Sequence, residues 1–307
     1  MLDGPRLEID SADDMFPDAL RHAPQSPERL FVIGNASAMQ EGIAVVGARR
    51  ATPYGLGCAE RFARLAANRG IAIISGGARG CDSKAHEAAL SAGTPTVVFL
   101  GGGCDRIYPA ENFDLFQRII DAGGAIVSEH LWTQEPIGYQ FRTRNRLIAG
   151  LAKATLIVEA GLPSGTFSTA DYALDANREV LAVPGSITSK NSRGANRLIA
   201  QGACPIIDDE TFCSCLDSIF GESGNSAGTS KQSSRLPVQM SLPDPDDPFF
   251  EVANALSAKP MTLESMHRIL YPKYAEDTMA RLMLWLTDQM KHQRISKYPD
   301  GTYGPNL

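Results

Sequence analysis

The chain of 307 residues, 43% of them apolar, can form one large globular domain and a smaller module. Its formal net charge of -6 excludes attraction of a polyanion by the protein's overall field, so a nucleic-acid partner would need a local patch of Arg and Lys. The start of the chain is acidic, and no stretch approaches the roughly 18 uninterrupted apolar residues of a membrane-spanning helix. We therefore expect a cytoplasmic protein without membrane insertion.

The first part of the chain is interrupted by prolines and is too short for a core of its own. We expect residues 1–40 to be a lead-in segment that packs on the main domain. From residue 41 onward one pattern repeats: a short β-branched run, a glycine-rich turn and a segment with the apolar spacing of a helix.

These repeats define the expected elements of the main domain. Strands are predicted at 43–47, 71–77, 96–103, 125–129, 155–161, 180–185 and 204–208. Helices are predicted at 57–69, 82–92, 112–122, 143–152, 166–177, 194–202 and 209–220. Near-continuous apolar strands that alternate with helices indicate an α/β fold with a doubly wound (Rossmann-like) parallel sheet and helices on both faces, over residues 41–220.

The composition changes after this domain. Residues 221–248 are dominated by Gly, Ser, Pro and Asp, which predicts a flexible linker. Residues 249–307 contain three apolar helical patterns and two short β-like runs around Asp300 and Gly301, which predicts a small winged-helix module.

Cysteine and histidine spacing gives no sign of a metal or redox site. The six cysteines include no C-x-x-C pair, and the histidines show no metal-ligand spacing. We expect reduced, buried thiols, no bound metal and no cofactor.

Cations and helix starts recur at one edge of the predicted sheet. In an open parallel sheet the loops beyond the carboxyl ends of the strands converge on the ligand. At least four successive loops there offer arginines, helix N-termini or both, as in Arg49, Arg79, the FRTRNR stretch and the Ser164–Gly165–Thr166 turn. Each loop alone could serve only a tight turn. A shared phosphate-bearing ligand accounts for them together.

Phe141 directly precedes the arginine cluster at 142, 144 and 146. An aromatic ring beside guanidinium groups is typical of sequence-tolerant single-strand sites, where bases stack and cations hold phosphates. The alternative is a core phenylalanine that anchors the following helix. The spacing leaves both open.

The sequence gives little support for a nucleotide-dependent or hydrolytic enzyme. The chain has no P-loop, no G-x-G-x-x-G after the first strand and no G-x-S-x-G elbow. His86 follows Asp82 by four residues on a predicted helix, which favours a hydrogen bond between the two side chains. Glu159, at a strand end, could be a catalytic carboxylate or the partner of an arginine, and the sequence does not decide between these.

The motifs taken together resemble the DprA/Smf family of DNA-processing proteins over roughly residues 16–215. The resemblance is carried, in this order, by VGARRATPYG, ISGGARGCDSKAHEAAL, GCDRIYPAEN, FRTRNRLIAGLAKATLIVEAGLPSGTFSTADYAL, REVLAVPGSI and RGANRLIAQGA. It implies a recombination mediator without known catalysis that acts in natural transformation, binds single-stranded DNA without strong sequence preference, helps to load RecA and forms homodimers.

The resemblance also implies which residues contact DNA. The family's Gly-Ser-Arg turn corresponds to Gly47, Ala48 and Arg49, so one hydroxyl contact is lost. Its Phe-x-x-Arg-Asn-Arg motif begins at Phe141, and the Lys that many members carry shortly before is missing, so that phosphate contact is either absent or supplied by Arg142. The expected DNA-binding residues are Gly47, Arg49, Arg79, Phe141, Arg142, Arg144, Asn145, Arg146, Ser164, Gly165 and Thr166.

Two other functions remain open at this point. The PSGT loop resembles the PGGxGT loop of LOG-type phosphoribohydrolases, so the same loops could serve a nucleotide-acting enzyme with Glu159 as its carboxylate, or a nucleotide-binding sensor. Alternatively, the winged-helix module, with seven Lys or Arg against six Asp or Glu over 249–307, could bind duplex DNA or dock a protein.

Overall fold

The computed structural model describes residues 1–162, 164–221, 249–258, 261–274, 278–291, 295–297 and 301–305. The chain divides into two compact units, Met1–Ser226 and Ala227–Leu307. Apart from Gly221, the predicted linker lies outside the described residues. None of the helices in the described part of the chain is both long enough and apolar enough to cross a bilayer.

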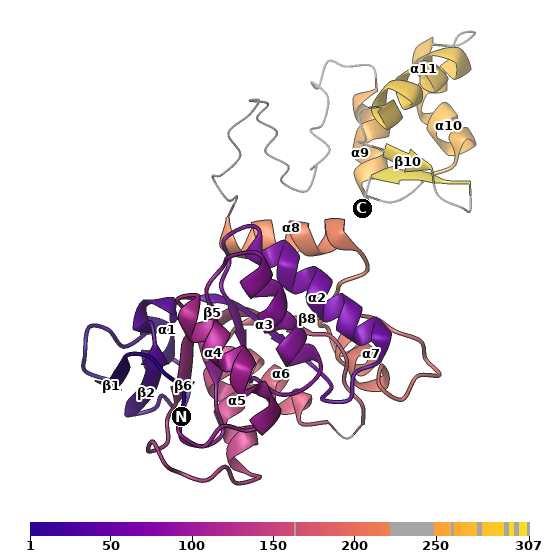
Figure 1. The fold of residues 1–307 in the computed structure, drawn as a ribbon. Coiled ribbons are helices and arrows are strands. Elements are labelled where there is room, and N and C mark those ends of the chain that lie inside the picture. Colours follow the sequence, from indigo (N-terminus) through magenta and orange to yellow (C-terminus); the bar gives the residue numbers. More distant parts are fainter. Residues whose placement is uncertain are drawn as a thin grey trace. The chain divides into compact units, whose positions relative to one another are not determined.

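The first unit, drawn from indigo to orange in Figure 1, is built on a nine-stranded sheet. The strand order is β1-β2-β6-β5-β4-β3-β7-β8-β9. Its strands are β1 (Arg6–Asp10), β2 (Arg29–Gly34), β3 (Gly42–Val46), β4 (Ile73–Ser75), β5 (Thr96–Phe99), β6 (Ala125–Ser128), β7 (Ala152–Ile157), β8 (Glu179–Ala182) and β9 (Cys204–Pro205). β3 to β9 pair in parallel. The chain runs outward from β3 to β6 and then returns to add β7 on the other side, so the switch point of the topology lies between β3 and β7.

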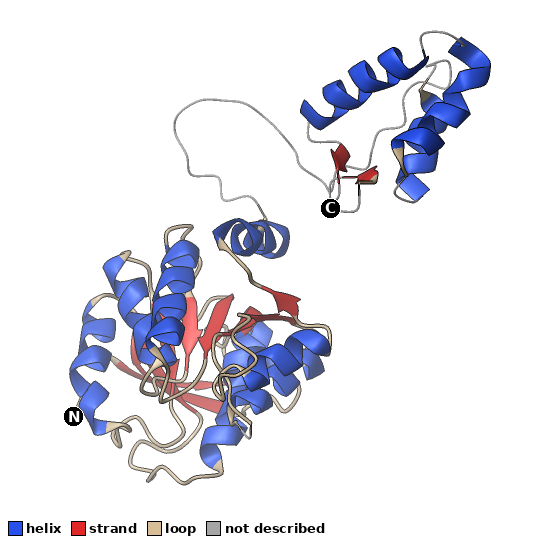
Figure 2. Cartoon of the chain, turned by 90° about the vertical axis from the view of Figure 1, so that its right-hand side faces the viewer, coloured by secondary structure: helices blue, strands red, loops and turns tan. Residues whose placement is uncertain are grey.

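Helices cover both faces of this sheet, which confirms the doubly wound class (Figure 2). They are α1 (Asp18–Arg21), η1 (Ala36–Ala38), α2 (Pro53–Ala67), α3 (Cys81–Ser91), η2 (Ala110–Asn112), α4 (Phe113–Asp121), α5 (Gln140–Leu151), α6 (Thr166–Asp175), α7 (Arg193–Ala200) and α8 (Asp209–Phe220). Alternate residues of β3 enter different cores: Ile43 and Val45 pack with α2, α3 and α8, whereas Ala44 and Val46 pack with α5, α6 and α7.

The start of the chain does more than pack on the domain. β1 pairs antiparallel with β2, and β2 pairs antiparallel with β6, so residues expected only as a lead-in extend the sheet by two strands. The run LFVI in β2 is buried throughout, which explains why it joins the sheet. The sheet is therefore mostly, but not wholly, parallel.

The described residues of the second unit form three helices and a two-stranded antiparallel hairpin, which are the elements predicted there from the sequence. Its elements are α9 (Phe250–Ala258), α10 (Leu263–Tyr274), α11 (Thr278–Lys291), β10 (Ile295–Lys297) and β11 (Tyr303–Pro305). A small core that includes Val252, Leu270 and Leu286 holds them together. Gly301 has a positive φ of 83° before β11, and Asp300 lies outside the described residues.

Candidate nucleic-acid interface

Two adjoining cavities open at the carboxyl ends of the parallel strands in the first unit. The larger cavity has a volume of about 680 Å³ and the smaller one about 240 Å³. Loops after β3, β4, β5, β7 and β8, together with α5 and the start of α6, supply the lining. This is the switch point of the sheet, and the larger volume is typical of a site for a small ligand or part of a larger one.

Phe141 lies at the boundary between the two cavities and lines both. Its ring centre is 5.3 Å from that of Tyr108, at an interplanar angle of 54°, and 5.3 Å from the guanidinium carbon of Arg49. The ring also rests on Gly101, where an added Cβ would lie 2.7 Å from Phe141 Cδ1. The half-buried ring is thus seated on the protein on one side and borders the cavities on the other.

Three exposed arginines surround this ring without a carboxylate partner among the described residues: Arg49, Arg50 and Arg142. Arg79 borders the smaller cavity but forms an ion pair with Glu111. The free cations therefore come from the loop after β3 and from α5. They can attract a polyanion, because none of them is neutralised by a described neighbour.

Arg144 is also part of the cavity wall, but it is buried, with 4% of its surface exposed. Its Nη1 donates to the carbonyl oxygen of Gly76 at 2.9 Å and to that of Phe99, so the guanidinium joins the ends of β4 and β5. Burial lowers the pKa of Arg144 to about 10, against the opposing influence of the Asp82 carboxylate. The sequence placed Arg144 among the DNA-binding residues, and in the structure its buried guanidinium also joins two strand ends.

Arg146, which the sequence placed among the DNA-binding residues, lies outside both cavity linings. Its Nη1 and Nη2 donate to the two carboxylate oxygens of Glu129 at 2.9 and 2.5 Å. The side chains are only 10% and 14% exposed, so this is a nearly buried, bidentate ion pair. The pair fixes α5 to the end of β6.

Asn145 ties α5 to the start of α6. Its Nδ2 donates to Ser168 Oγ at 2.9 Å and to the carbonyl oxygen of Gly165 at 3.3 Å. Ser164 Oγ accepts from the amide of Thr166 at 3.2 Å. Asn145, Ser164, Gly165 and Thr166 border the larger cavity, but much of their hydrogen-bonding capacity is used within the turn.

Gly47 borders the larger cavity through its backbone. A Cβ at this position would lie 2.6 Å from Cys81 Sγ, so glycine allows β3 to approach the start of α3. Ala48 follows in the same lining, and the missing side-chain hydroxyl leaves this turn to contribute backbone groups and Arg49.

Glu159 is neither exposed in the cavity nor paired with an arginine among the described residues. It is 1% exposed and accepts from the Thr52 amide at 2.9 Å and the Thr52 hydroxyl at 2.5 Å. This arrangement disagrees with both roles that the sequence left open for Glu159. The residue is neither a catalytic carboxylate in the site nor the partner of a described arginine. Its carboxylate instead anchors the start of α2.

The expected contact between Asp82 and His86 is absent. His86 Nδ1 lies 2.7 Å from Thr96 Oγ1, whereas Asp82 accepts from the amides of Gly76 and Ala78 at 3.2 and 3.3 Å. Burial raises the pKa of the Asp82 carboxyl, and Arg144 opposes that shift. No group of three His, Cys, Asp or Glu side chains in the described ranges could hold a metal ion.

The site residues expected from the sequence did not include Arg50, Tyr108 or Asn191. All three border the larger cavity. The signal was present for Tyr108, because it follows the third parallel strand at the same edge as Phe141. Nothing local marks Asn191, whose Nδ2 donates to the carbonyl oxygen of Arg50 at 3.0 Å.

Comparison with known proteins identifies the family. The family model described as DNA recombination-mediator protein A matches residues 8–217. Protein Smf of Escherichia coli strain K12 is 39% identical over 211 residues, which cover 68% of this chain and 56% of that protein. The chain thus spans little more than half the length of that curated relative.

Two solved structures share both fold and sequence. DNA processing protein A (DprA) from Streptococcus pneumoniae gives a TM-score of 0.63 at 32% identity, covering 68% of this chain and 74% of the other. DNA processing protein A from Helicobacter pylori, whose structure concerns its single-stranded DNA binding mode, gives 0.63 at 30% identity, covering 71% and 98%. The resemblance of the motifs, the family match and the shared sheet agree, and the chain belongs to the DNA recombination-mediator protein A family, the DprA/Smf proteins.

Proposed function

We propose that this protein binds single-stranded DNA, without strong sequence preference, in the two cavities at the switch point of its sheet. The observation that carries the proposal is the half-buried ring of Phe141 in one cavity wall with the unpaired cations Arg49, Arg50 and Arg142. The H. pylori relative, whose structure concerns single-stranded DNA binding, supports the same ligand class.

In this proposal, cations and ring have separate tasks. Arg49 and Arg142 neutralise backbone phosphates, which requires no particular base. Phe141 and Tyr108 offer aromatic surfaces on which an unstacked base can lie. A base inside a duplex cannot enter a concave pocket without leaving its stack, so the arrangement favours a single strand.

The full role we propose is that of a recombination mediator that helps to load a RecA-type recombinase on single-stranded DNA in natural transformation. Membership of the DNA recombination-mediator protein A family supports this role. We further propose a cytoplasmic homodimer, as the family resemblance implies. Co-sedimentation of RecA with DNA coated by this protein, and the mass of the protein in solution, test these two parts separately.

We propose no catalysis at this site. The LOG-like alternative requires a free Glu159 carboxylate. This carboxylate instead accepts hydrogen bonds from the amide and the hydroxyl of Thr52, which argues against that alternative. Incubation with nucleoside monophosphates should release no base. Release that disappears in Glu159→Gln would establish the enzymatic alternative instead.

Most of the exposed side chains that the structure describes on the third helix of the second unit are apolar. They are Met279, Met283, Leu284 and Met290, beside the exposed Arg281 and Thr287. A mostly apolar surface attracts phosphates weakly, so we place the DNA site in the first unit.

A binding assay tests the proposal directly. The full chain should bind a short labelled single-stranded oligonucleotide more tightly than the matching duplex, as measured by fluorescence anisotropy. Arg49→Ala should weaken binding, whereas Arg61→Ala should not, because Arg61 is paired with Asp209 and borders neither cavity. Equal binding by both variants would contradict the proposed site.

A further inference from the structure

Two interlocked loops adjoin the aromatic rings of the candidate site. Residues 100–109, after β5, carry Tyr108, and residues 129–139, after β6, lead into Phe141. The amide of Gly103 donates to the carbonyl oxygen of Gln134, and the amide of Asp105 donates to that of Trp132, both at 2.8 Å. Movement of one loop would therefore break hydrogen bonds of the other.

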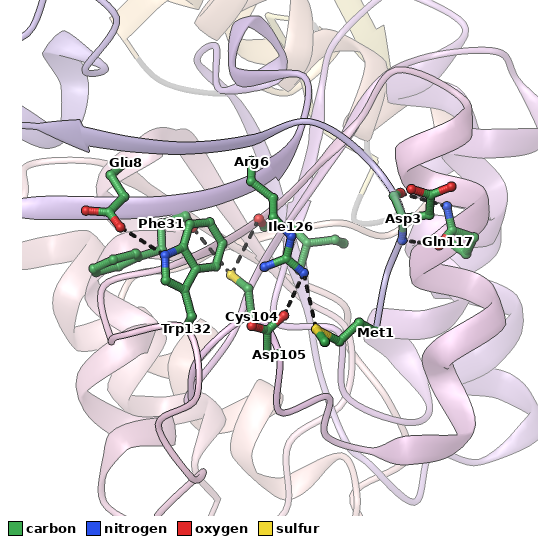
Figure 3. A network of polar contacts seen from close by, with 10 residues as sticks. All are labelled: Met1, Asp3, Arg6, Glu8, Phe31, Cys104, Asp105, Gln117, Ile126 and Trp132. Atoms are coloured by element: carbon green, nitrogen blue, oxygen red, sulfur yellow. Dashed lines mark hydrogen bonds and ion pairs between the residues drawn. The ribbon is translucent and has the colours of Figure 1, made fainter.

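The second loop is held from outside by the first strand of the chain (Figure 3). The Trp132 indole lies 5.0 Å from the Arg6 guanidinium carbon and makes an edge-on contact with Phe31 at 5.3 Å. Its Nε1 donates to Glu8 Oε1 at 2.9 Å. A cation–π contact, an aromatic contact and a hydrogen bond thus fix one side chain.

The first loop is held by the same strand. Arg6 Nη2 donates to Asp105 Oδ1 at 2.7 Å, where the two side chains are 34% and 13% exposed, and this bond raises the pKa of Arg6. Beside it, the fully buried Cys104 thiol donates to the carbonyl oxygen of Phe31 at 3.4 Å. Figure 3 shows Arg6 reaching both Asp105 and Trp132.

The strand is itself anchored at its start, by two hydrogen bonds of 2.9 Å between the backbone of Asp3 and the side chain of Gln117 in α4. We call residues 1–10 the strap. Its side chains Arg6 and Glu8 border neither cavity, and neither do Asp105 and Trp132.

We propose that the strap is a positioning element for the DNA site: Arg6 and Glu8, acting through Asp105 and Trp132, hold Tyr108 and Phe141 in the geometry that stacks a base. The inference rests on the proposed function. It extends the site to residues that touch no ligand, and it makes the antiparallel extension of the sheet part of the binding apparatus.

The proposal separates base stacking from phosphate binding. Loosening the strap disturbs the two aromatic rings and, through the start of α5, also Arg142. Arg49 and Arg50 lie on the loop after β3 and keep their positions. Affinity for a single strand should therefore fall, while the slope of log affinity against log salt decreases by no more than about 0.7, the share of the single phosphate that Arg142 neutralises. The part of the loss that comes from stacking should not exceed that of removing the Phe141 ring, about 5- to 150-fold.

The experiment uses the full chain with Trp132→Leu and Arg6→Ala, each alone and combined with Phe141→Leu. Anisotropy titrations over a range of salt give affinity and slope, and hydrogen exchange with mass spectrometry reports on residues 100–109 and 129–141. Arg61→Ala is the matched control for Arg6→Ala, since it removes one arginine from a surface ion pair, with Asp209, that contacts neither loop. Arg6 is exposed, so Arg6→Ala keeps the test valid even where Trp132→Leu does not fold.

We expect both strap variants to bind more weakly, with a slope lowered by no more than about 0.7 and with faster exchange in the two loops. Their effect on affinity should be smaller when Phe141→Leu is already present, because only the contribution of Tyr108 is then left to lose. The inference is overturned if the variants bind and exchange like the wild type, or if their effect adds fully to that of Phe141→Leu. Absence of binding by the wild-type protein refutes the proposed function instead. In that case the exchange data still decide whether the strap holds the loops.

Discussion

The guanidinium carbon of Arg49 lies 5.3 Å from the centre of the Phe141 ring, in a contact between the loop after β3 and the first turn of α5. The two residues come from opposite sides of the sheet's switch point, where β3 and β7 become neighbours. In the proposed complex, the phosphate and the base of one nucleotide can therefore contact two adjacent side chains, Arg49 and Phe141. The following predictions separate the two contributions.

Arg49→Ala should reduce both the affinity for single-stranded DNA and its salt dependence. Arg49 is exposed and has no carboxylate partner among the described residues, so its charge is available to a phosphate. Loss of one phosphate contact lowers the slope of log affinity against log salt by about 0.7 for a single strand. Titrations at several salt concentrations measure this slope. An unchanged slope would show that Arg49 does not contact a phosphate.

Phe141→Leu should weaken binding by about 1 to 3 kcal/mol without altering the salt slope, because stacking on a ring releases no counterions. Leucine retains much of the contact with Gly101, so the free energy of unfolding should fall by less than about 1.5 kcal/mol. Binding and chemical unfolding of the same variant give both numbers. If folded Phe141→Leu bound single-stranded DNA with full affinity, the Phe141 ring would serve only in packing.

Arg146→Ala should act on stability rather than on binding. Removing the guanidinium leaves the nearly buried Glu129 carboxylate without its partner, which costs about 3 kcal/mol of unfolding free energy. The salt slope should stay at the wild-type value, because Arg146 is outside both cavity linings. The double variant Arg146→Met with Glu129→Leu should recover part of the stability. A lowered slope with intact stability would contradict the structural role.

His86 should make the protein less stable in acid. Burial lowers its pKa to about 3, so the folded state keeps the ring neutral, whereas the unfolded chain binds a proton near the ordinary pKa of about 6.5. Since the unfolded state then binds more protons, the free energy of unfolding falls as the pH drops from about 6.5 towards 3, by up to about 1.4 kcal/mol per pH unit.

The variant His86→Leu isolates this effect. Thr96, the partner of His86, still donates its hydroxyl to the carbonyl oxygen of Ile73 in that variant. Urea unfolding at pH 7 and pH 5 should show a loss for the wild type that exceeds the loss for the variant by about 2 kcal/mol. Equal losses would show that His86 is not the group responsible.

Much of the fold follows from local sequence patterns. β-branched runs such as those of β3 and β7 are buried on both faces and are bounded by glycine, which specifies parallel strands between helices. The two antiparallel strands at the start were not predicted. Their pairing depends on β6, which lies far along the chain, and prolines obscured the apolar run of β2.

The sequence predicted where the site lies on the sheet, but it did not predict which partners each side chain contacts there. Topology alone puts Arg49 and Phe141 at one edge of the sheet, and both border the cavities there. Arg144 is buried against the carbonyl oxygens of Gly76 and Phe99, and Arg146 is paired with Glu129, all of which come from other segments of the chain. The sequence of a motif does not show whether its arginine has such a buried partner or remains a free cation.

Photo-crosslinking tests the central claim most directly. A single-stranded oligonucleotide carrying 5-iodouracil is bound to the full chain and irradiated, and the attached peptide is identified by mass spectrometry. The account predicts attachment to the peptides that contain Tyr108 and Phe141, and loss of attachment in Phe141→Leu. Attachment confined to the winged-helix unit, with these two peptides unmodified, would contradict it.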